Sequence, residues 1–415
     1  MLKQVELLAP AGAFDSLQAA INSGANAVYF GVEQLNMRTR SAGSFSIADI
    51  KEISAVCRMN GVKSYITLNT VMYEHDMQLL KTILKEVKKQ KTDAVIAADF
   101  AVMECCRQMQ IPVHISTQAN VSNIESVKFF SQYADVVVLA RELTLKQIKH
   151  ITDGIYRQKI KGPSGELVKI EVFVHGALCM AVSGKCYLSL HAQNASANRG
   201  ACVQNCRRPY IVKDAESGEE LVIDNEYIMS PKDLCTINIL DQVINSGVDV
   251  LKIEGRSKGA DYVQVVTACY REAIDAVHNG TFSIERVNGW KQELEKVYNR
   301  GFWEGYYLGR RLGEFTPHPG SAATEKKIYI GKGVRHYPKI GIGEFAIESG
   351  SLQCGDTLMA TGRHYGMLKQ KVETLWVNGN CGSKAVKGDK VTFAVTGKIT
   401  PADKLYKIVQ GALHE

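Results

Sequence analysis

The chain has 415 residues, of which 45% are hydrophobic, 22% charged and 8% aromatic, and this composition excludes disordered, collagen-like and coiled-coil proteins. Its formal net charge is +7, and residues 326–415 hold the whole excess, with 14 basic and 7 acidic side chains. No apolar run reaches the roughly 18 residues that span a bilayer, and no secretory signal precedes the first strand-like run. We therefore expect a cytoplasmic protein without a membrane partner.

Eight short apolar runs in the first 255 residues predict the strands of a parallel sheet. Most are continuous runs of Val, Ile and Leu, which is typical of strands buried on both faces. The runs cover residues 5–9, 27–31, 63–69, 94–99, 113–118, 135–140, 169–176 and 249–255. Between them lie amphipathic stretches that predict helices, such as 16–22, 47–59, 77–89 and 143–151. This alternation predicts an α/β fold, a (β/α)8 TIM-like barrel, with an open doubly wound sheet as the alternative.

The interval between the seventh and eighth predicted strands is too long for one helix and its loops. It predicts an insertion at about 176–235, on the C-terminal face of the barrel where catalytic loops gather. Two further helices, 262–278 and 284–298, complete a barrel domain that we place at 1–320. A Pro-His-Pro-Gly linker ends it. Short alternating runs with many glycines then predict a small basic β-barrel domain over 326–415.

The charge distribution bears on the kind of partner. Residues 1–325 are formally neutral, because the excess of positive charge is confined to the last ninety residues. A basic region on a neutral body is typical of proteins that bind polyanions such as RNA. The alternative is a lysine-rich domain without such a partner.

Five of the eleven cysteines fall in or at the end of the insertion. They are Cys179, Cys186, Cys202, Cys206 and Cys235. Clustered thiols in a reducing compartment favour metal or redox chemistry over disulfides. Four thiolates can hold zinc or a [4Fe–4S] cluster, and the presence of only one close pair, Cys202 and Cys206, favours the cluster over a zinc ribbon. Which four of the five are ligands stays open, and buried unligated thiols are the alternative.

The seventh predicted strand carries the candidate catalytic residues. Glu171, Phe173 and His175 alternate along one face of this strand, and if that face points into the barrel, the carboxylate and the imidazole would meet beneath the insertion. His175 is predicted to act as a general base or hydrogen-bond donor. The alternative is a histidine buried in the core.

Other polar residues stand at the ends of predicted strands, where barrel enzymes keep their sites. The candidate substrate-binding residues are Arg38, Asn69, Gln118, Arg141, Lys252, Glu254 and Arg256. The three arginines predict a cage for a small anionic metabolite, because a guanidinium binds carboxylates in a bidentate manner. Lys252 and Glu254 share one face of a strand, and the alternative is that they pair with each other.

Several blocks of sequence together resemble the collagenase-like U32 peptidase family. They are EVFVHGALCMAVSGKCYLS at 171–189, ELLAPAG at 6–12, RGACVQNCR at 199–207, KDLC at 232–235 and LKIEGR at 251–256. Despite its name, this family includes RNA hydroxylases and ubiquinone-pathway hydroxylation proteins, several of which are tied to an iron–sulfur cluster. The usual phosphate-loop, zincin and hydrolase motifs do not occur in the chain.

The resemblance implies a specific activity. In size the chain is most similar to family members that hydroxylate carbon 5 of uridine 34 in tRNA with prephenate as co-substrate. It implies tRNA as a partner, a paralogous protein as a possible further one, and a [4Fe–4S] cluster on Cys179, Cys186, Cys202 and Cys235, with Cys206 as the alternate ligand. The alternatives are a peptidase acting on collagen-like or unfolded chains through His175, and a non-enzymatic RNA-binding accessory protein.

Overall fold

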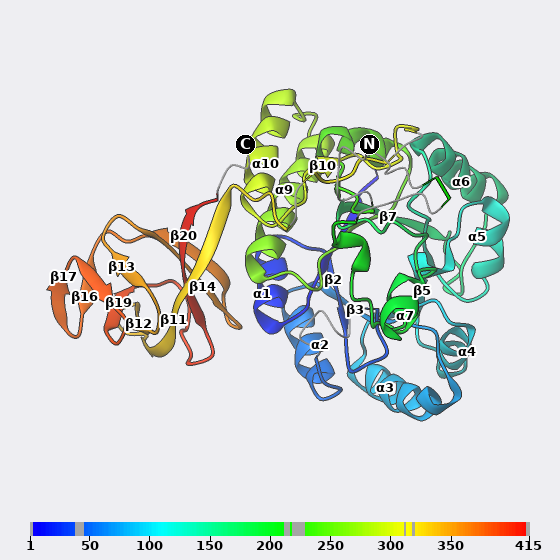
Figure 1. Ribbon diagram of the computed structural model, residues 1–415. Coiled ribbons are helices and arrows are strands. Elements are labelled where there is room, and N and C mark those ends of the chain that lie inside the picture. The colour runs from blue at the N-terminus through cyan, green and yellow to red at the C-terminus, as the bar shows by residue number, and fades with distance from the viewer. Residues whose placement is uncertain are drawn as a thin grey trace.

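The computed structural model describes residues 3–37, 45–210, 216–217, 229–310, 313–317 and 320–411. Eight parallel strands form a closed barrel (Figure 1). They are β1 (Glu6–Pro10), β2 (Ala27–Gly31), β3 (Lys63–Leu68), β4 (Ala94–Ala97), β5 (Val113–Ile115), β6 (Val136–Val138), β7 (Lys169–Gly176) and β9 (Val250–Ile253). The ring closes because β9 pairs in parallel with both β7 and β1. The predicted TIM-like barrel is therefore confirmed.

Helices cover the outside of this barrel. They are α1 (Phe14–Asn22), α2 (Asp49–Met59), α3 (Met77–Gln90), α4 (Phe100–Met109), α5 (Ile124–Phe130), α6 (Leu145–Gln158), α8 (Leu240–Asn245) and α9 (Ala260–His278), with α10 (Ile284–Lys296) packed on α9. Each buries one apolar stripe, as α3 does with Leu80, Ile83, Leu84 and Val87. Among the residues that the structure describes, no helix is both long and apolar enough to cross a membrane.

The insertion leaves the barrel at the end of β7 and returns beside the same strand. It contains α7 (Leu188–Gln193) and two short 3-10 turns, Ala197–Arg199 and Asn205–Arg207. It ends in β8 (Asp233–Cys235), which runs antiparallel to the last residues of β7 and pairs on its other edge with β10 (Phe302–Trp303). The insertion is thus attached to the edge of the barrel at both ends.

The chain turns out of β7 at Gly176, where only glycine fits. Its φ is +105°, and a Cβ built there would lie 2.4 Å from the carbonyl oxygen of Glu254. We expect Gly176→Ala to lower the free energy of unfolding by roughly 2–4 kcal/mol, because left-handed strain and a backbone clash add up. Denaturant titration measures this change.

The matched control is Gly165→Ala. Gly165 has a φ of +84°, but nothing lies within 4 Å of its added Cβ. Only the backbone strain applies there, so the expected loss is about 1 kcal/mol. Equal losses at the two glycines would show that the contact with Glu254 has no effect on stability.

The residues after the barrel form an antiparallel all-β region, as the sequence predicts. Its larger sheet has the order β15-β14-β20-β11-β12-β19-β16-β17, and β13 pairs with β18. The strands are β11 (Glu325–Tyr337), β12 (Ile342–Ile347), β13 (Ser351–Gln353), β14 (Thr357–Gly362), β15 (Gly366–Lys371), β16 (Leu375–Val377), β17 (Asn380–Gly382), β18 (Lys384–Val386), β19 (Lys390–Ala394) and β20 (Lys404–Gln410). The region has its own buried cluster, in which the rings of Phe345 and Phe393 stack at 4.9 Å.

This region packs directly on the barrel, beside α1 in Figure 1. Met359 and Met367 belong to the same buried cluster as the barrel core. A Cβ on Gly366 would lie 2.6 Å from the backbone nitrogen of Ala19, so β15 touches the backbone of α1. The Arg363 guanidinium also pairs with Glu52 at 2.6 Å. The two regions therefore share an apolar seam.

Candidate active site

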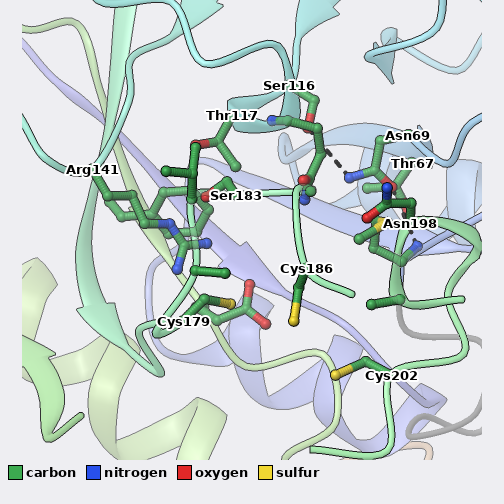
Figure 2. Close-up of a pocket in the computed structure, with 18 of the residues that line it drawn as sticks. Thr67, Asn69, Ser116, Thr117, Arg141, Cys179, Ser183, Cys186, Asn198 and Cys202 are labelled. Carbon is green, nitrogen blue, oxygen red and sulfur yellow. Dashed lines mark hydrogen bonds between the residues drawn. The ribbon is translucent and has the colours of Figure 1, made fainter. Parts of the chain in front are cut away.

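A pocket opens at the carboxyl ends of the barrel strands, beneath the insertion (Figure 2). The space among its lining residues is about 940 Å³, which includes open solvent. Strand ends supply one set of lining side chains, and the insertion supplies the other. Figure 2 shows Arg141 on one side, Thr67, Asn69 and Asn198 on the other, and sulfur atoms at the mouth.

The structure brings six of the seven predicted substrate-binding residues to this one pocket. They are Asn69, Gln118, Arg141, Lys252, Glu254 and Arg256. They meet because parallel strands present all their carboxyl ends on one face of the barrel. The seventh, Arg38, lies outside the described residues.

Arg256 is held in a fixed orientation. Its Nη1 donates to Thr67 Oγ1 at 2.5 Å and to Asn36 Oδ1 at 3.1 Å, and the residue is 5% exposed. Gly31 makes room for it, because a Cβ there would lie 2.7 Å from Nη1. A guanidinium fixed in this way loses little side-chain entropy when it binds a carboxylate.

Lys252 lies at the floor of the pocket, inside the barrel. Its Nζ donates to Glu171 Oε1 at 2.6 Å and lies 4.6 Å from the centre of the Tyr29 ring. Burial raises the pKa of Glu171, while the Lys252 ammonium acts in the opposite direction. Lys252 therefore pairs with Glu171 rather than with Glu254, and Glu171 lies beneath the pocket instead of lining it.

Arg141 provides a third cation. Its guanidinium lies 4.0 Å above the Phe173 ring, and Nη1 donates to the Ala177 carbonyl at 3.0 Å. Its buried Nε has no partner among the described residues. Arg141, Lys252 and Arg256 thus face one cavity together with Glu254, and Arg141 and Arg256, which are not used by the ion pair of Lys252 with Glu171, could bind a small anion.

Four of the five clustered thiols line the mouth of the pocket: Cys179, Cys186, Cys202 and Cys206. Burial raises the pKa of Cys206, Arg207 lowers it, and Cys179, Cys202 and Cys186 each raise it through charge repulsion. The thiols of Cys179, Cys186 and Cys202 are therefore each close enough to Cys206 to act on its charge. Within the described ranges, no three His, Cys, Asp or Glu side chains are placed to hold a metal ion together. The set of four thiols fits an iron–sulfur cluster in its donor chemistry, although the sulfur atoms do not stand in a coordination sphere.

Cys235 does not join the other thiols, which corrects the predicted ligand set of Cys179, Cys186, Cys202 and Cys235. It lies in β8 opposite His175, and its buried Sγ accepts from the Tyr270 hydroxyl at 3.9 Å. Burial raises the pKa of the Cys235 thiol to about 11. The antiparallel return of the insertion thus turns this thiol towards α9, and the alternate ligand Cys206 takes the place at the pocket.

His175 lies outside the pocket, so the basis for its predicted catalytic role is lost. The ladder between β7 and β9 shifts register between Phe173 and His175. Phe173 lines the pocket, but the His175 ring packs 5.5 Å from the rings of Tyr270 and Phe302. Burial lowers the pKa of His175 to about 3, so the imidazole is neutral. The alternative interpretation, a histidine in the core, describes this position.

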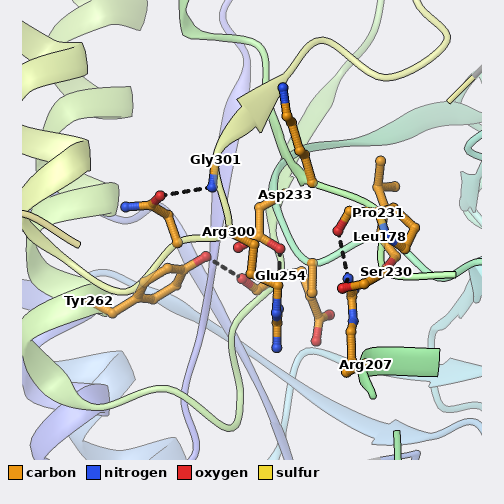
Figure 3. Close-up of polar contacts among 12 residues, drawn as sticks. Leu178, Arg207, Ser230, Pro231, Asp233, Glu254, Tyr262, Arg300 and Gly301 are labelled. Atoms are coloured by element: carbon orange, nitrogen blue, oxygen red, sulfur yellow. Dashed lines mark hydrogen bonds and ion pairs between the residues drawn. The ribbon is translucent and has the colours of Figure 1, made fainter. Parts of the chain in front are cut away.

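Arg207, the residue after Cys206, contacts Leu178, Ser230 and Pro231 (Figure 3). Its Nη2 donates to the carbonyl of Leu178, next to Cys179, at 2.6 Å. Its Nη1 donates to Ser230 Oγ at 2.9 Å and to the Pro231 carbonyl at 2.5 Å. The side chain that follows Cys206 therefore ties together the start, the middle and the end of the insertion.

Some lining residues could not be found from the sequence. Thr67 and Tyr29 belong to apolar strands and carry no motif, and Asn198 lies in the insertion without a distinctive spacing. Cys206 did have a signal. It is four residues from Cys202, and the 3-10 turn at Asn205–Arg207 keeps both thiols on the pocket side.

Comparisons with known proteins place this barrel in a family. The sequence profile of peptidase family U32 matches residues 12–316. The chain belongs to this family. A relative named "Collagenase" from Porphyromonas gingivalis is 52% identical over 97% of both chains. The "tRNA hydroxylation protein P1" of Bacillus subtilis is 35% identical over 74% of this chain and 72% of its own length. The "23S rRNA 5-hydroxycytidine C2501 synthase" of Escherichia coli is 34% identical over 75% of this chain and 46% of its own.

U32 relatives thus carry names from two kinds of activity, and the matched residues 12–316 include every barrel strand except β1 as well as the five clustered thiols. In this member of the family, no histidine lines the described pocket. A Cys–His pair for peptide hydrolysis is therefore not assembled there.

Proposed function

We propose that this U32 protein is a tRNA-modifying enzyme that hydroxylates carbon 5 of uridine 34 with prephenate as co-substrate. The observation that carries the proposal is the meeting of three cations, several amides and hydroxyls, and four thiols in one pocket. The names of the RNA-hydroxylating relatives support the substrate class. An unstacked base in an RNA loop is small and flat enough to enter such a site.

The charged side of the pocket suits the co-substrate. Prephenate is a dianion, and Arg141, Lys252 and Arg256 face the cavity, where Glu254 is the one lining carboxylate among the described residues. Arg256, held by Thr67 and Asn36, would orient one carboxylate. Asn69 and Gln118 would offer amide groups to the edge of a pyrimidine.

The thiols at the mouth would hold a [4Fe–4S] cluster through Cys179, Cys186, Cys202 and Cys206. Such a cluster, when bound, supplies single-electron transfer. Arg207 would keep the cysteine loop closed over the pocket, and the Met180 and Val182 side chains beside it would limit access of water. The basic region from residue 326 onward would bind RNA phosphates.

Nucleoside mass spectrometry of tRNA from a deletion strain tests the proposal. We expect 5-hydroxyuridine derivatives to disappear and the wild-type gene to restore them. Arg256→Lys should restore less than a tenth, because lysine cannot reproduce the planar fork that Thr67 and Asn36 orient. The control Arg157→Lys changes an exposed arginine outside the pocket and should restore fully. Unchanged modification in the deletion strain would contradict the proposed function.

A peptidase is the second candidate, favoured by the name of the 52% identical relative. It predicts that the purified protein cleaves gelatin and that Cys179→Ser prevents cleavage. Because no histidine lines the described pocket, we expect no cleavage. RNA binding without any modification in the strain experiment would instead identify an accessory protein.

A further inference from the structure

The segment that carries the thiols has an unusual charge composition. From residue 172 to residue 213 the sequence holds no Asp or Glu, although 43 acidic residues in 415 would place about four in a stretch of this length. The cations of this stretch are Lys185, Arg199, Arg207, Arg208 and Lys213. A surface without carboxylates attracts anions without local repulsion.

Two of these cations are free to meet a ligand. Arg207 is used within the insertion, and Arg199 pairs with Asp76 at 2.5 Å. Lys185 and Arg208 are exposed, and neither forms an ion pair with any residue that the structure describes. Their charge is therefore available at the surface.

Exposed rings accompany these cations. Tyr187 is 69% exposed, far more than a tyrosine needs for its hydroxyl alone to reach water. Tyr73 is 50% exposed and has the Arg199 guanidinium stacked 4.0 Å over one face of its ring. Aromatic and guanidinium planes of this kind are what unstacked bases pack against.

These side chains belong to the same short segments as two thiols of the pocket. Lys185 and Tyr187 flank Cys186, and Arg208 is two residues from Cys206, while both of those cysteines line the cavity. Consecutive Cα atoms are only 3.8 Å apart. We refer to Lys185, Tyr187 and Arg208 as the rim.

We propose that the rim is a docking surface for a single-stranded RNA loop, separate from the basic C-terminal region. A base next to the target stacks on Tyr187, and the adjoining phosphates lie near Lys185 and Arg208. This proposal rests on the proposed function for its RNA substrate. Unpaired cations beside an exposed ring match the alternating phosphates and bases of an RNA loop.

The stacking part is tested by fluorescence anisotropy with a labelled anticodon stem-loop RNA and the full-length protein. Tyr187→Ala should weaken binding about ten-fold, whereas Tyr187→Phe, which keeps the ring, should bind like the wild type. Tyr187 is exposed and provides no side-chain cap to α7, so its loss should leave the fold intact. Equal binding by Tyr187→Ala and the wild type would overturn the stacking contact.

The phosphate contacts are tested by the salt dependence of the same binding. In a Lys185→Gln and Arg208→Gln double variant, the slope of log Kd against log salt concentration should fall by about 1.4–1.8. The control double variant, Lys161→Gln and Lys169→Gln, removes two exposed lysines at the opposite end of β7 and should leave the slope unchanged.

The outcomes separate this proposal from the proposed function. If the wild type neither binds nor modifies RNA, the proposed function fails. If the wild type modifies tRNA and the rim variants bind RNA as tightly with the same slope, only the rim proposal fails. Loss of binding to an acidic protein with unchanged RNA binding would make the rim a protein interface and would also overturn it.

Discussion

Replacing Cys206 with serine is expected to remove most of the iron and the visible absorbance from the anaerobically purified protein, whereas Cys235→Ser should retain both. Cys206 lines the pocket with Cys179, Cys186 and Cys202, while Cys235 is enclosed between β7 and α9. Loss of one of four thiolates removes a cluster ligand that serine replaces poorly. Iron and sulfide analysis of the two variants, side by side, measures the difference.

A thiol far from the pocket serves as the control. Cys354 is exposed in the C-terminal region, so Cys354→Ser should keep the full iron content. The opposite pattern, with iron lost from Cys235→Ser and kept by Cys206→Ser, would mean that the insertion rearranges when it binds the cluster. Iron-free wild-type protein would remove the cluster from the proposal altogether.

Replacing Lys252 with methionine should lower the free energy of unfolding by about 3–5 kcal/mol at neutral pH, because Glu171 would remain buried without its cation. Lys252 and Glu171 are 5% and 0% exposed in their side chains, and they are 2.6 Å apart. The double variant Lys252→Met with Glu171→Leu should recover most of the loss, since it removes both charges. Denaturant titration of the three proteins measures these differences.

The loss in the single variant should depend on pH. Burial already raises the pKa of Glu171 in the folded protein, and without Lys252 the carboxyl stays protonated to still higher pH. The folded state then binds more protons than the unfolded state above the ordinary pKa of glutamate, so stability falls as pH rises through that window. The Lys252→Met variant should therefore lose less free energy of unfolding at pH 5 than at pH 8. An equal loss at both pH values would contradict the premise that Glu171 is ionised in the wild-type protein.

The barrel was predictable because its strands are buried on both faces and its polar residues stand at strand ends. Asn69, Gln118 and Arg256 could be assigned to one face from topology alone, without knowledge of their contacts. His175 could not be assigned in this way. Strict alternation places it on the same face of β7 as Phe173, but the register shift in the ladder with β9 turns it away from that face. A bulge of this kind depends on tertiary packing, which periodicity does not encode.

For the thiols too, local spacing could be interpreted from the sequence, whereas contacts between distant segments could not. The spacing of Cys202 and Cys206 is short enough for one turn to fix their relation. Cys235 follows a long stretch of chain, so its partner depends on how that chain returns to the barrel. The pairing of β8 with β7 determines where the Cys235 side chain lies, and no sequence motif near Cys235 predicts that pairing.

Met359 and Met367 connect the barrel and the C-terminal sheet energetically, because both side chains fill the barrel's own apolar cluster. If the sheet came away from α1, it would uncover those side chains together with the backbone contact between Gly366 and Ala19. We therefore expect neither region to reach its native stability alone. The distance between the basic strands and the pocket mouth is then fixed by this packed interface and not by a flexible linker.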